Sequence, residues 1–312
     1  MRGLLSLPDL MNLSRSNGID TLALTDVNGM WGFIRFVQHC KDAGIRPIAG
    51  TNLITEKDEV ILLAENQYGY ENMCRAVSAV HDNPNQSVVD ILEKRLAGLF
   101  ILAHDELTLK KLIKIIPDTH LFIELRPGDQ ESLPKRMAKE LKLEMVITGD
   151  VYFRSPSDHD AHITLRAIEN NTTLEQLNIS ECKTDQHWFR SEAEMVTLFP
   201  NSLDALNNSR YLADRCKTDW TFINTIFPGL SLKETHVSNK RLKDKVYAGA
   251  RIRYGEVDET IRQRIEYELD LITQKGFAPY FLIVQDIVTQ TRATIGRGSA
   301  AASIVSYCLF IT

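Results

Sequence analysis

Hydrophobic positions in the first 150 residues form short apolar runs separated by stretches with helical spacing. The runs lie at 21–25, 45–50, 60–64, 99–103, 121–125 and 145–148, and helical spacing occupies 29–43 and 70–80. In the first helical stretch Phe33, Phe36, Val37 and Cys40 recur at i, i+3, i+4 and i+7, and Gly44 follows as its stop. Short strands separated by helices are typical of parallel βα units, and six in succession favour a barrel over an open sheet. Functional residues of such a barrel are expected where the strands end.

After about residue 190 the pattern becomes almost entirely helical. The predicted helices occupy 191–198, 203–216, 240–254 and 258–275. In the last of them Ile261, Ile265 and Leu269 belong to one apolar stripe. A Phe-Pro-Gly sequence starting at Phe227 is a predicted linker. We therefore expect two domains, 1–227 with the βα pattern and a helical extension, and 228–312 with helices.

Composition places the chain among globular proteins, with 44% hydrophobic and 25% charged residues. No apolar run approaches the roughly 18 residues that span a bilayer, and the first residues do not resemble a secretory signal. A cytoplasmic protein with no membrane partner is expected. The five cysteines form no CxxC pair, which favours buried reduced thiols over a zinc site.

The net charge of −5 conceals an asymmetry between the two expected domains. Residues 228–312 hold 12 basic and 9 acidic side chains, a net of +3. The remainder holds 36−12 = 24 basic and 41−9 = 32 acidic side chains, a net of −8. Binding to nucleic-acid phosphates depends on concentrated positive charge, so the second domain is the better candidate for contact with DNA.

The strongest local signal for chemistry is a glycine-rich segment at 296–303 with the sequence GRGSAAAS, followed directly by a helix-like stretch. Glycine lets a backbone approach a ligand closely, and a helix start offers unpaired N–H groups to phosphate. Arg297 adds a charged hydrogen-bonding fork and Ser299 a hydroxyl. The segment matches neither the Walker A nor the dinucleotide motif. Without other information, a tight turn between packed helices is the more common explanation of such a segment.

A second segment, GFAPYFLIVQDIV at 276–288, precedes this turn. The two segments, in this order and at this spacing, resemble the start of the palm in C-family bacterial DNA polymerases, the DNA polymerase III alpha-subunit type. That palm is similar to the polymerase-beta-like nucleotidyltransferase fold, in which a Gly-Ser turn binds the incoming triphosphate. Carried over by position, Arg297, Gly298 and Ser299 are the expected phosphate contacts.

This resemblance implies template-directed DNA synthesis, with template-primer DNA, deoxynucleoside triphosphates and Mg2+ in the complete enzyme. Phosphoryl transfer uses two metal ions held by carboxylates. In the family an Asp-x-Asp pair supplies them tens of residues after the turn, which is beyond Thr312. We therefore expect no catalytic residue within this chain and no polymerase activity from it alone.

The first 216 residues resemble the PHP domain (polymerase and histidinol phosphatase) that precedes the palm in these polymerases. The resemblance includes LALTD at 22–26, AGIRPIAG at 43–50 and ITGDV at 147–151. It implies a distorted βα barrel. Active PHP domains bind a metal cluster through His, Asp and Glu at strand ends, and hydrolyse phosphoesters.

The ligand set implied by the PHP resemblance is eroded in this chain. Only Asp26 and Asp150 remain. Other residues stand at four positions where active members carry ligands: Val27, Asn52, Gly128 and Tyr152. The opening His-x-His motif of the family would precede Met1. We expect no bound metal in this domain and a structural role for it.

Two other classes of function stay open. One is a metal-dependent phosphoesterase, which the lost ligands disfavour. The other is a non-catalytic scaffold, because in some members of the resembled family the PHP domain docks a proofreading exonuclease. Other replisome subunits are further candidate partners.

Overall fold

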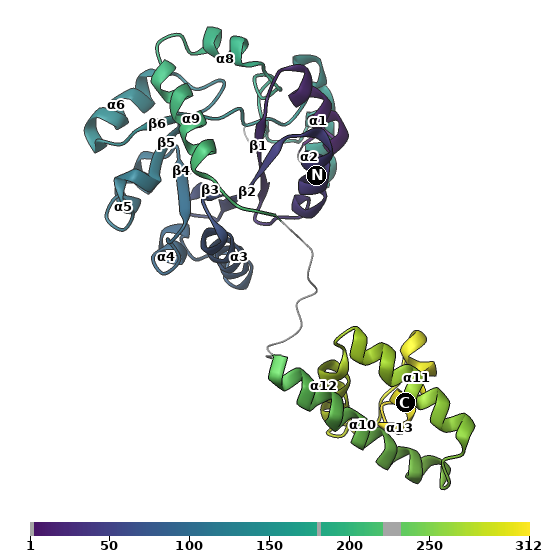
Figure 1. Cartoon of the computed structure of the whole chain (residues 1–312). Helices are drawn as coiled ribbons and strands as arrows, with labels where there is room; N and C mark the ends of the chain where they lie inside the picture. Colours follow the sequence, from purple (N-terminus) through teal and green to yellow (C-terminus); the bar gives the residue numbers. More distant parts are fainter. Residues whose placement is uncertain (1–2, 180–181, 221–231) are drawn as a thin grey trace. The chain divides into compact units, whose positions relative to one another are not determined.

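The computed structural model describes residues 3–179, 182–220 and 232–312, and the chain divides into two compact units at Trp220 and Thr221. The unit that ends at Trp220 contains a six-stranded sheet with helices around it, and the other unit is helical (Figure 1). The domain boundary predicted near Phe227 lies outside the described residues. Each unit has a hydrophobic core of its own.

The sheet of the first unit has the strand order β1-β2-β3-β4-β5-β6 and is curled like half of a barrel (Figure 1). The strands are β1 (Thr21–Val27), β2 (Arg46–Ile54), β3 (Glu59–Ala64), β4 (Leu99–Ala103), β5 (Leu121–Leu125) and β6 (Met145–Ile147). All six overlap the predicted apolar runs, so the predicted α/β class with a distorted PHP-type βα barrel is confirmed, in the form of a half-barrel. Within the described residues, β1 and β6 do not pair with each other, so the barrel does not close.

One strand departs from the parallel arrangement that the sequence pattern predicted. β3 runs antiparallel to both β2 and β4, whereas the other pairs are parallel. Only four residues, 55–58, connect β2 to β3, and so short a connection can make a hairpin but not a crossover. As a result, Glu59 at the start of β3 lies at the same edge of the sheet as the carboxyl ends of the other strands.

Helices cover both faces of the sheet. Side chains alternate along β4, with Leu99 and Ile101 in the larger core and Phe100 and Leu102 in a second core. The larger core packs against α1 (Leu7–Ser16), α2 (Phe33–Ala43), α3 (Gln67–Asp82), α4 (Val88–Leu92), α5 (Glu106–Leu112) and α6 (Ser132–Leu141). The second core is covered by α9 (Leu203–Arg215), which crosses the inside of the curl in Figure 1.

Helix α9 also covers the edge of β6. The side chains of Asn208 and Ser209 donate hydrogen bonds to the backbone carbonyls of Met145, at 2.9 Å, and Ile147, at 2.6 Å. An edge strand otherwise presents unpaired carbonyls, which are costly to bury. This contact stabilises the open sheet without a seventh strand. The remaining elements of this unit are the helices α7 (His159–Glu169) and α8 (Glu192–Leu198) and the 3-10 turns η1 (Asp118–His120) and η2 (Pro156–Asp158).

The second unit packs four helices around one core. They are α10 (Leu232–Tyr254), α11 (Glu259–Gln274), α12 (Ala278–Val288) and the short α13 (Ile304–Cys308), with a 3-10 turn, η4, at Ser299–Ala302. The predicted stripe of α11 is part of this core, with Ile265 and Leu269 buried. Gly249 of α10 lies against the backbone of Cys308, where a Cβ atom would come within 1.8 Å of the carbonyl oxygen. Glycine at this position therefore lets α10 and α13 pack closely.

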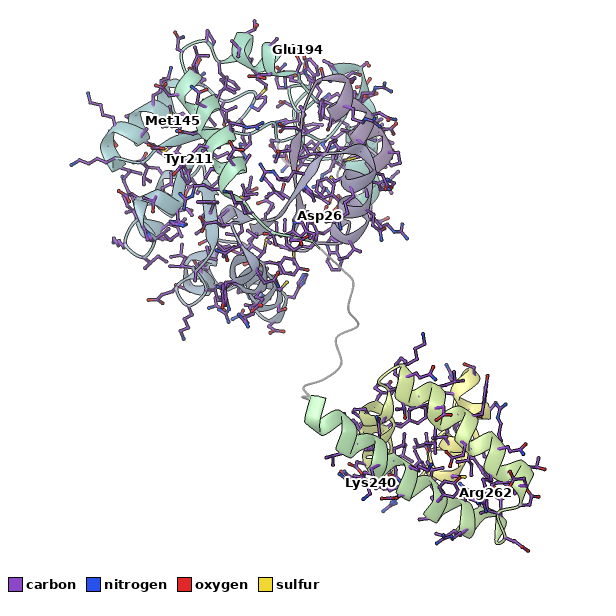
Figure 2. The ribbon with its side chains drawn as sticks, viewed as in Figure 1. Asp26, Met145, Glu194, Tyr211, Lys240 and Arg262 are labelled. Carbon is purple, nitrogen blue, oxygen red and sulfur yellow. The ribbon has the colours of Figure 1, made fainter. Side chains whose placement is uncertain are left out.

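Figure 2 shows the side chains on both units, with Asp26 at the sheet and Lys240 and Arg262 on the helices of the second unit. None of the described helices is long and apolar enough to cross a membrane.

Candidate functional site: a strand-end cavity and a Gly-Ser turn

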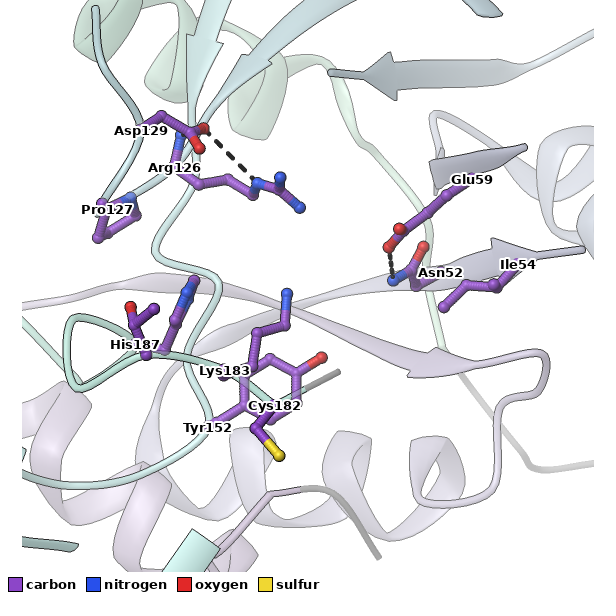
Figure 3. Close-up of a pocket in the computed structure, with 12 residues that line it drawn as sticks. Asn52, Ile54, Glu59, Arg126, Pro127, Asp129, Tyr152, Cys182, Lys183 and His187 are labelled. Carbon is purple, nitrogen blue, oxygen red and sulfur yellow. Dashed lines mark hydrogen bonds and ion pairs between the residues drawn. The ribbon is translucent and has the colours of Figure 1, made fainter. Parts of the chain in front are cut away.

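A cavity of about 360 Å3 opens at the carboxyl ends of the strands of the first unit. Its wall comes from the end of β2, the start of β3, the segment after β5 and the segments around 152 and 182–187 (Figure 3). The lining is mostly polar and carries both signs of charge, from Arg126 and Lys183 on one hand and Glu59 and Asp129 on the other. Five of the six strands run in the same direction, so their carboxyl ends lie at one edge of the sheet. Residues distant in sequence therefore meet around this cavity.

Asp150 lies next to this cavity and has strong partners. Lys183 Nζ donates a hydrogen bond to Asp150 Oδ2 at 2.6 Å, and Nδ1 of His187 lies 3.1 Å from the same oxygen. Burial alone would raise the pKa of Asp150, but the hydrogen bond from His187 and the charge of Lys183 hold it well below its usual range. This carboxylate is therefore ionised and already neutralised by the protein.

The backbone holds Lys183 in place. The buried His162 accepts a hydrogen bond from the Lys183 N–H through Nε2, at 3.1 Å. The Lys183 ammonium also lies 5.0 Å from the centre of the Tyr152 ring. These contacts orient the cation toward both Asp150 and the cavity.

The Asp26 carboxylate is hydrogen-bonded to a nearby backbone amide. Its Oδ2 accepts a hydrogen bond from the Gly32 N–H at 2.9 Å, at the start of α2. Neither Asp26 nor its neighbour Val27 is among the residues that line the cavity. Carboxylates near helix N-termini are stabilised by the unpaired amides there, so a structural role accounts for this contact.

Two buried polar atoms of the cavity wall lack hydrogen-bond partners. Asn52 is 8% exposed, and its Nδ2 donates to Glu59 Oε1 at 2.7 Å, while its Oδ1 has no partner. Arg126 Nε has none either, and its nearest carboxylate oxygen, on Asp129, is 3.6 Å away. In Figure 3 the Arg126 guanidinium, the Lys183 ammonium and the Asn52 amide all extend toward the same space. Unpaired buried polar atoms are costly, so this arrangement is suited to a ligand or to water.

A buried carboxyl group lies behind the cavity. Glu124 of β5 is 2% exposed, accepts a hydrogen bond from Thr148 Oγ1 at 2.6 Å, and lies 3.9 Å from Nδ1 of His104. Burial raises the pKa of Glu124 to about 7, although the charge of Arg126 opposes the shift. Burial, with a smaller contribution from Arg126, lowers the pKa of His104. The Glu124 carboxyl therefore titrates near neutral pH.

The residues present do not fit a metal cluster. Across the described ranges, no group of three or more His, Cys, Asp or Glu side chains is arranged to hold a metal ion. Asp150, which lies next to the cavity, is already bonded to Lys183. A hydrolytic metal needs several fixed ligands and an open position for water, and this arrangement supplies neither.

The Gly-Ser turn of the second unit has a different character. Residues 293–300 are exposed, and Arg297 makes no hydrogen bond or ion pair with any described residue. Gly298 has φ 73° and ψ −170°, a conformation that glycine adopts without strain. The backbone N–H groups of 298–300 have no acceptor among the described residues. The turn thus presents a cation and consecutive donors to solvent, which is the chemistry that a phosphate group needs.

The N-terminus of the following helix is occupied by a carboxylate from within the unit. Glu268 of α11 is 8% exposed, and its Oε2 accepts hydrogen bonds from Ser303 Oγ at 2.6 Å and from the Val305 N–H at 3.2 Å. Ser303 in turn accepts from the Ser306 N–H. The sequence suggested that the start of helix 304–308 offers its backbone N–H groups to phosphate. This is wrong for Val305 and Ser306, because the Val305 N–H already donates to Glu268 and the Ser306 N–H to Ser303.

Comparison with known families agrees with this division into two units. The PHP domain family matches residues 1–114, and the family described as the bacterial DNA polymerase III alpha NTPase domain matches residues 240–312. The chain is 29% identical to an error-prone DNA polymerase of Symbiobacterium thermophilum, over 98% of this chain and 32% of that protein. It is also 29% identical to the DNA polymerase III subunit alpha of Pasteurella multocida, over 100% of this chain and 31% of that protein.

Both relatives and the family matched by residues 240–312 are those of bacterial DNA polymerases of the DNA polymerase III alpha type, which this chain resembles over its whole length. The family resemblance predicted from the sequence motifs is therefore confirmed, and the chain spans about a third of the length of these relatives. Among solved structures, a candidate metal-dependent phosphoesterase of Bifidobacterium adolescentis superposes with a TM-score of 0.34 at 12% identity, over 48% of this chain and 83% of that one. This similarity is too low to carry over any property.

Three of the four residues that were predicted from the sequence to replace ligands line the cavity: Asn52, Gly128 and Tyr152. The sequence did not single out Arg126 or Lys183 as members of the same site. Arg126 follows β5 directly, so its place at a strand end was a usable signal. Lys183 lies in an irregular segment with no local motif, and only the tertiary structure brings it to Asp150.

Proposed function

We propose that this chain forms part of a DNA-directed DNA polymerase, a nucleotidyltransferase of bacterial DNA replication or repair. The observation that supports this best is the pair of named polymerase relatives, which align with essentially the whole chain. In this proposal the complete enzyme binds template-primer DNA and deoxynucleoside triphosphates in the cytoplasm and uses Mg2+ to transfer the nucleotidyl group.

The proposed contribution of the second unit is to hold the triphosphate. Arg297 supplies a charged fork, Ser299 a hydroxyl, and the backbone around Gly298 a set of amide donors. Their exposure and the absence of partners for them in the described part of the chain support this role, since a packing turn would bury or pair them. Charge-assisted hydrogen bonds of this type contribute about 1.5–3 kcal/mol each.

The proposed contribution of the first unit is structural, with no hydrolytic metal centre. The ion pair between Lys183 and Asp150 supports this, because it takes up the carboxylate that a metal would need. A role as a dock for a proofreading exonuclease or other replisome subunits is compatible with such a unit.

The test is a chimera in which this chain replaces the matching segment of the Pasteurella multocida relative. We expect primer extension with Mg2+, and about tenfold or greater loss of kcat/KM for nucleotide in Arg297→Ala, with a smaller loss in Ser299→Ala. Arg262→Ala on α11, an exposed arginine paired with Glu259, is the matched control. Circular dichroism verifies folding. Unchanged nucleotide kinetics in both turn variants of an active chimera would rule out the phosphate role.

A further inference from the structure

The segment that follows α13 contains a phenylalanine in a backbone conformation that favours glycine. Phe310 has φ 60°. Its N–H donates to the Tyr307 carbonyl at 3.1 Å, and the Ile311 N–H donates to the Ser306 carbonyl at 3.0 Å. This pair of bonds is typical of a helix end at which glycine usually takes the left-handed position. A bulky residue keeps such a conformation only where its surroundings hold it there.

Arg253, in the last turn of α10, contacts this segment in three ways. Its Cζ lies 4.4 Å from the centre of the Phe310 ring and 4.1 Å from the centre of the Tyr307 ring. Its Nη2 donates a hydrogen bond to the backbone oxygen of Thr312 at 2.9 Å. The buried Nε has no hydrogen-bond partner among the described residues. Because an unpartnered buried donor is costly, the ring contacts and the bond to Thr312 must set the position of this side chain.

Thr312 in turn packs against the first residue of the Gly-Ser turn. A Cβ atom at Gly296 would come within 2.6 Å of Thr312 Cγ2 and within 3.2 Å of Ala301 Cβ. Gly296 therefore lies directly on the segment that Arg253 holds and on the far end of the turn. Residues 297–300 connect these two contacts and are themselves exposed. Fixing Thr312 thus restrains the base of the turn and leaves its tip accessible.

We propose that Arg253 is a positioning residue for the Gly-Ser turn. It holds 310–312 against Gly296, and so keeps Arg297 and the backbone amides of 298–300 in one arrangement. Donors that are already ordered bind a ligand more tightly, because ordering them at the moment of binding costs free energy. The effect on nucleotide rests on the phosphate role proposed above, whereas the effect on the order of the turn does not.

The first experiment measures the order of the turn in the whole chain, without nucleotide. Nitrogen-15 relaxation gives the backbone order parameters of Gly298 and Ser299 in the parent chain and in Arg253→Met. We expect both order parameters to fall below about 0.6 in the variant, the range of flexible backbone, because Thr312 is no longer held. Order parameters equal to those of the parent chain would overturn the proposal.

Lys243→Met is the matched control, because it removes another cation of α10 that is paired and lies near a ring. Lys243 Nζ donates to Glu266 Oε2 at 2.8 Å and lies 6.0 Å from the centre of the Tyr247 ring. These contacts are to α11 and to α10 itself, so the order parameters of the turn are expected to stay as in the parent chain. An equal loss of order in Lys243→Met would contradict a specific role of Arg253.

Folding of the variants is followed by circular dichroism. Should Arg253→Met fail to fold, Arg253→Lys keeps the charge but loses the planar guanidinium that lies against the rings. An intermediate loss of order is then expected at Gly298 and Ser299. Order parameters equal to those of the parent chain in folded Arg253→Lys would overturn the proposal in that case.

The second experiment uses the chimera described above and separates positioning from stability. A variant that only destabilises the unit lowers the fraction of folded enzyme, and so lowers the apparent kcat without changing KM. We expect Arg253→Met to raise KM for nucleotide at least about fivefold, because the phosphate contacts are no longer ordered. A fall in kcat with unchanged KM would show that Arg253 only stabilises the unit, and would overturn the proposal.

The two experiments also distinguish this proposal from the phosphate role itself. Loss of order in Arg253→Met together with unchanged kinetics in Arg297→Ala would contradict the phosphate role while supporting Arg253 as the residue that positions the turn. Impaired nucleotide kinetics in Arg297→Ala with an unchanged turn in Arg253→Met would have the opposite meaning.

Discussion

The strand-end cavity of the first unit and the Gly-Ser turn of the second differ in how many of their polar groups already have hydrogen-bond or ion-pair partners within the protein. Around the cavity, Lys183 and His187 neutralise Asp150. The buried side-chain atoms that lack a hydrogen-bond partner there are Asn52 Oδ1 and Arg126 Nε. At the turn, Arg297 and the amides of 298–300 have no partner among the described residues. A carboxylate that has gained an internal cation is poorly suited to a metal, whereas an exposed turn with free donors is suited to an incoming phosphate.

The largest expected effect tests whether the two regions belong to independent folding units. Phe36→Ala removes a fully buried ring from the core of the first unit and is expected to lower its free energy of unfolding by about 3–5 kcal/mol. All three tryptophans, Trp31, Trp188 and Trp220, lie in this unit, so their fluorescence reports it alone. Circular dichroism at 222 nm additionally follows the helices of the second unit.

The matched variant is Ile265→Ala, at a fully buried position of α11 in the second unit. It is expected to leave the urea midpoint of tryptophan fluorescence unchanged while shifting part of the circular dichroism transition. A single transition that moves in both variants would show that the units unfold together.

A second prediction concerns the buried carboxyl group beneath the cavity. Because the pKa of Glu124 is raised to about 7 in the folded state, from 4.5, the unfolded chain ionises first as pH rises. The stability contributed by Glu124 is therefore fully present below about pH 4.5 and is lost as pH rises through 7, by roughly 3 kcal/mol. Glu124→Gln is expected to abolish this loss, measured by urea unfolding between pH 5 and pH 8.

Glu140→Gln, on the half-exposed face of α6, is the control for this pH dependence. It is expected to retain the decline of stability seen in the parent chain. A decline that persists unchanged in Glu124→Gln would show that another group carries it.

A smaller effect is expected where the second unit caps its own helix. Glu268→Ala removes the acceptor of Ser303 Oγ and of the Val305 N–H, and is expected to lower the stability of this unit by about 1–2 kcal/mol. Faster amide hydrogen exchange at Val305 is the specific readout, with Glu266→Ala, on the same helix, as the comparison. Equal exchange of the Val305 amide in both variants would contradict the capping role.

The smallest effect is expected at the turn. Arg297→Ala removes an exposed side chain that has no partner in the part of the chain that the structure describes, so its effect on stability is expected to be below about 0.5 kcal/mol. Urea unfolding followed by circular dichroism measures it. A loss of 1 kcal/mol or more in the free energy of unfolding would mean that Arg297 stabilises the fold. The turn would then no longer differ from the cavity in having polar groups without internal partners.

Much of the local structure could be predicted from the pattern alone. The six strands and the helices α2, α3, α8, α9 and α11 lie where apolar spacing places them, and Gly44 adopts φ 71° as the predicted helix stop. Helices α1, α4, α5, α6 and α7 were not predicted, because they are short or their apolar positions are interrupted by charge. The antiparallel direction of β3 was not predicted either, because an apolar run does not indicate in which direction the strand pairs with its neighbours.

The sequence by itself determined the family resemblance and the positions of the strands, because these depend on residue identity and local spacing. The replacement of ligands by Val27, Asn52, Gly128 and Tyr152 rests on residue identity as well and stays a prediction. Only the tertiary structure decided that Arg126 and Lys183 meet at one cavity, and that Lys183 neutralises an aspartate 33 residues away. The charge state of a buried group depends on its distance to other groups and on its burial. Both are set by long-range packing of the sheet and its connecting segments, which no local pattern encodes.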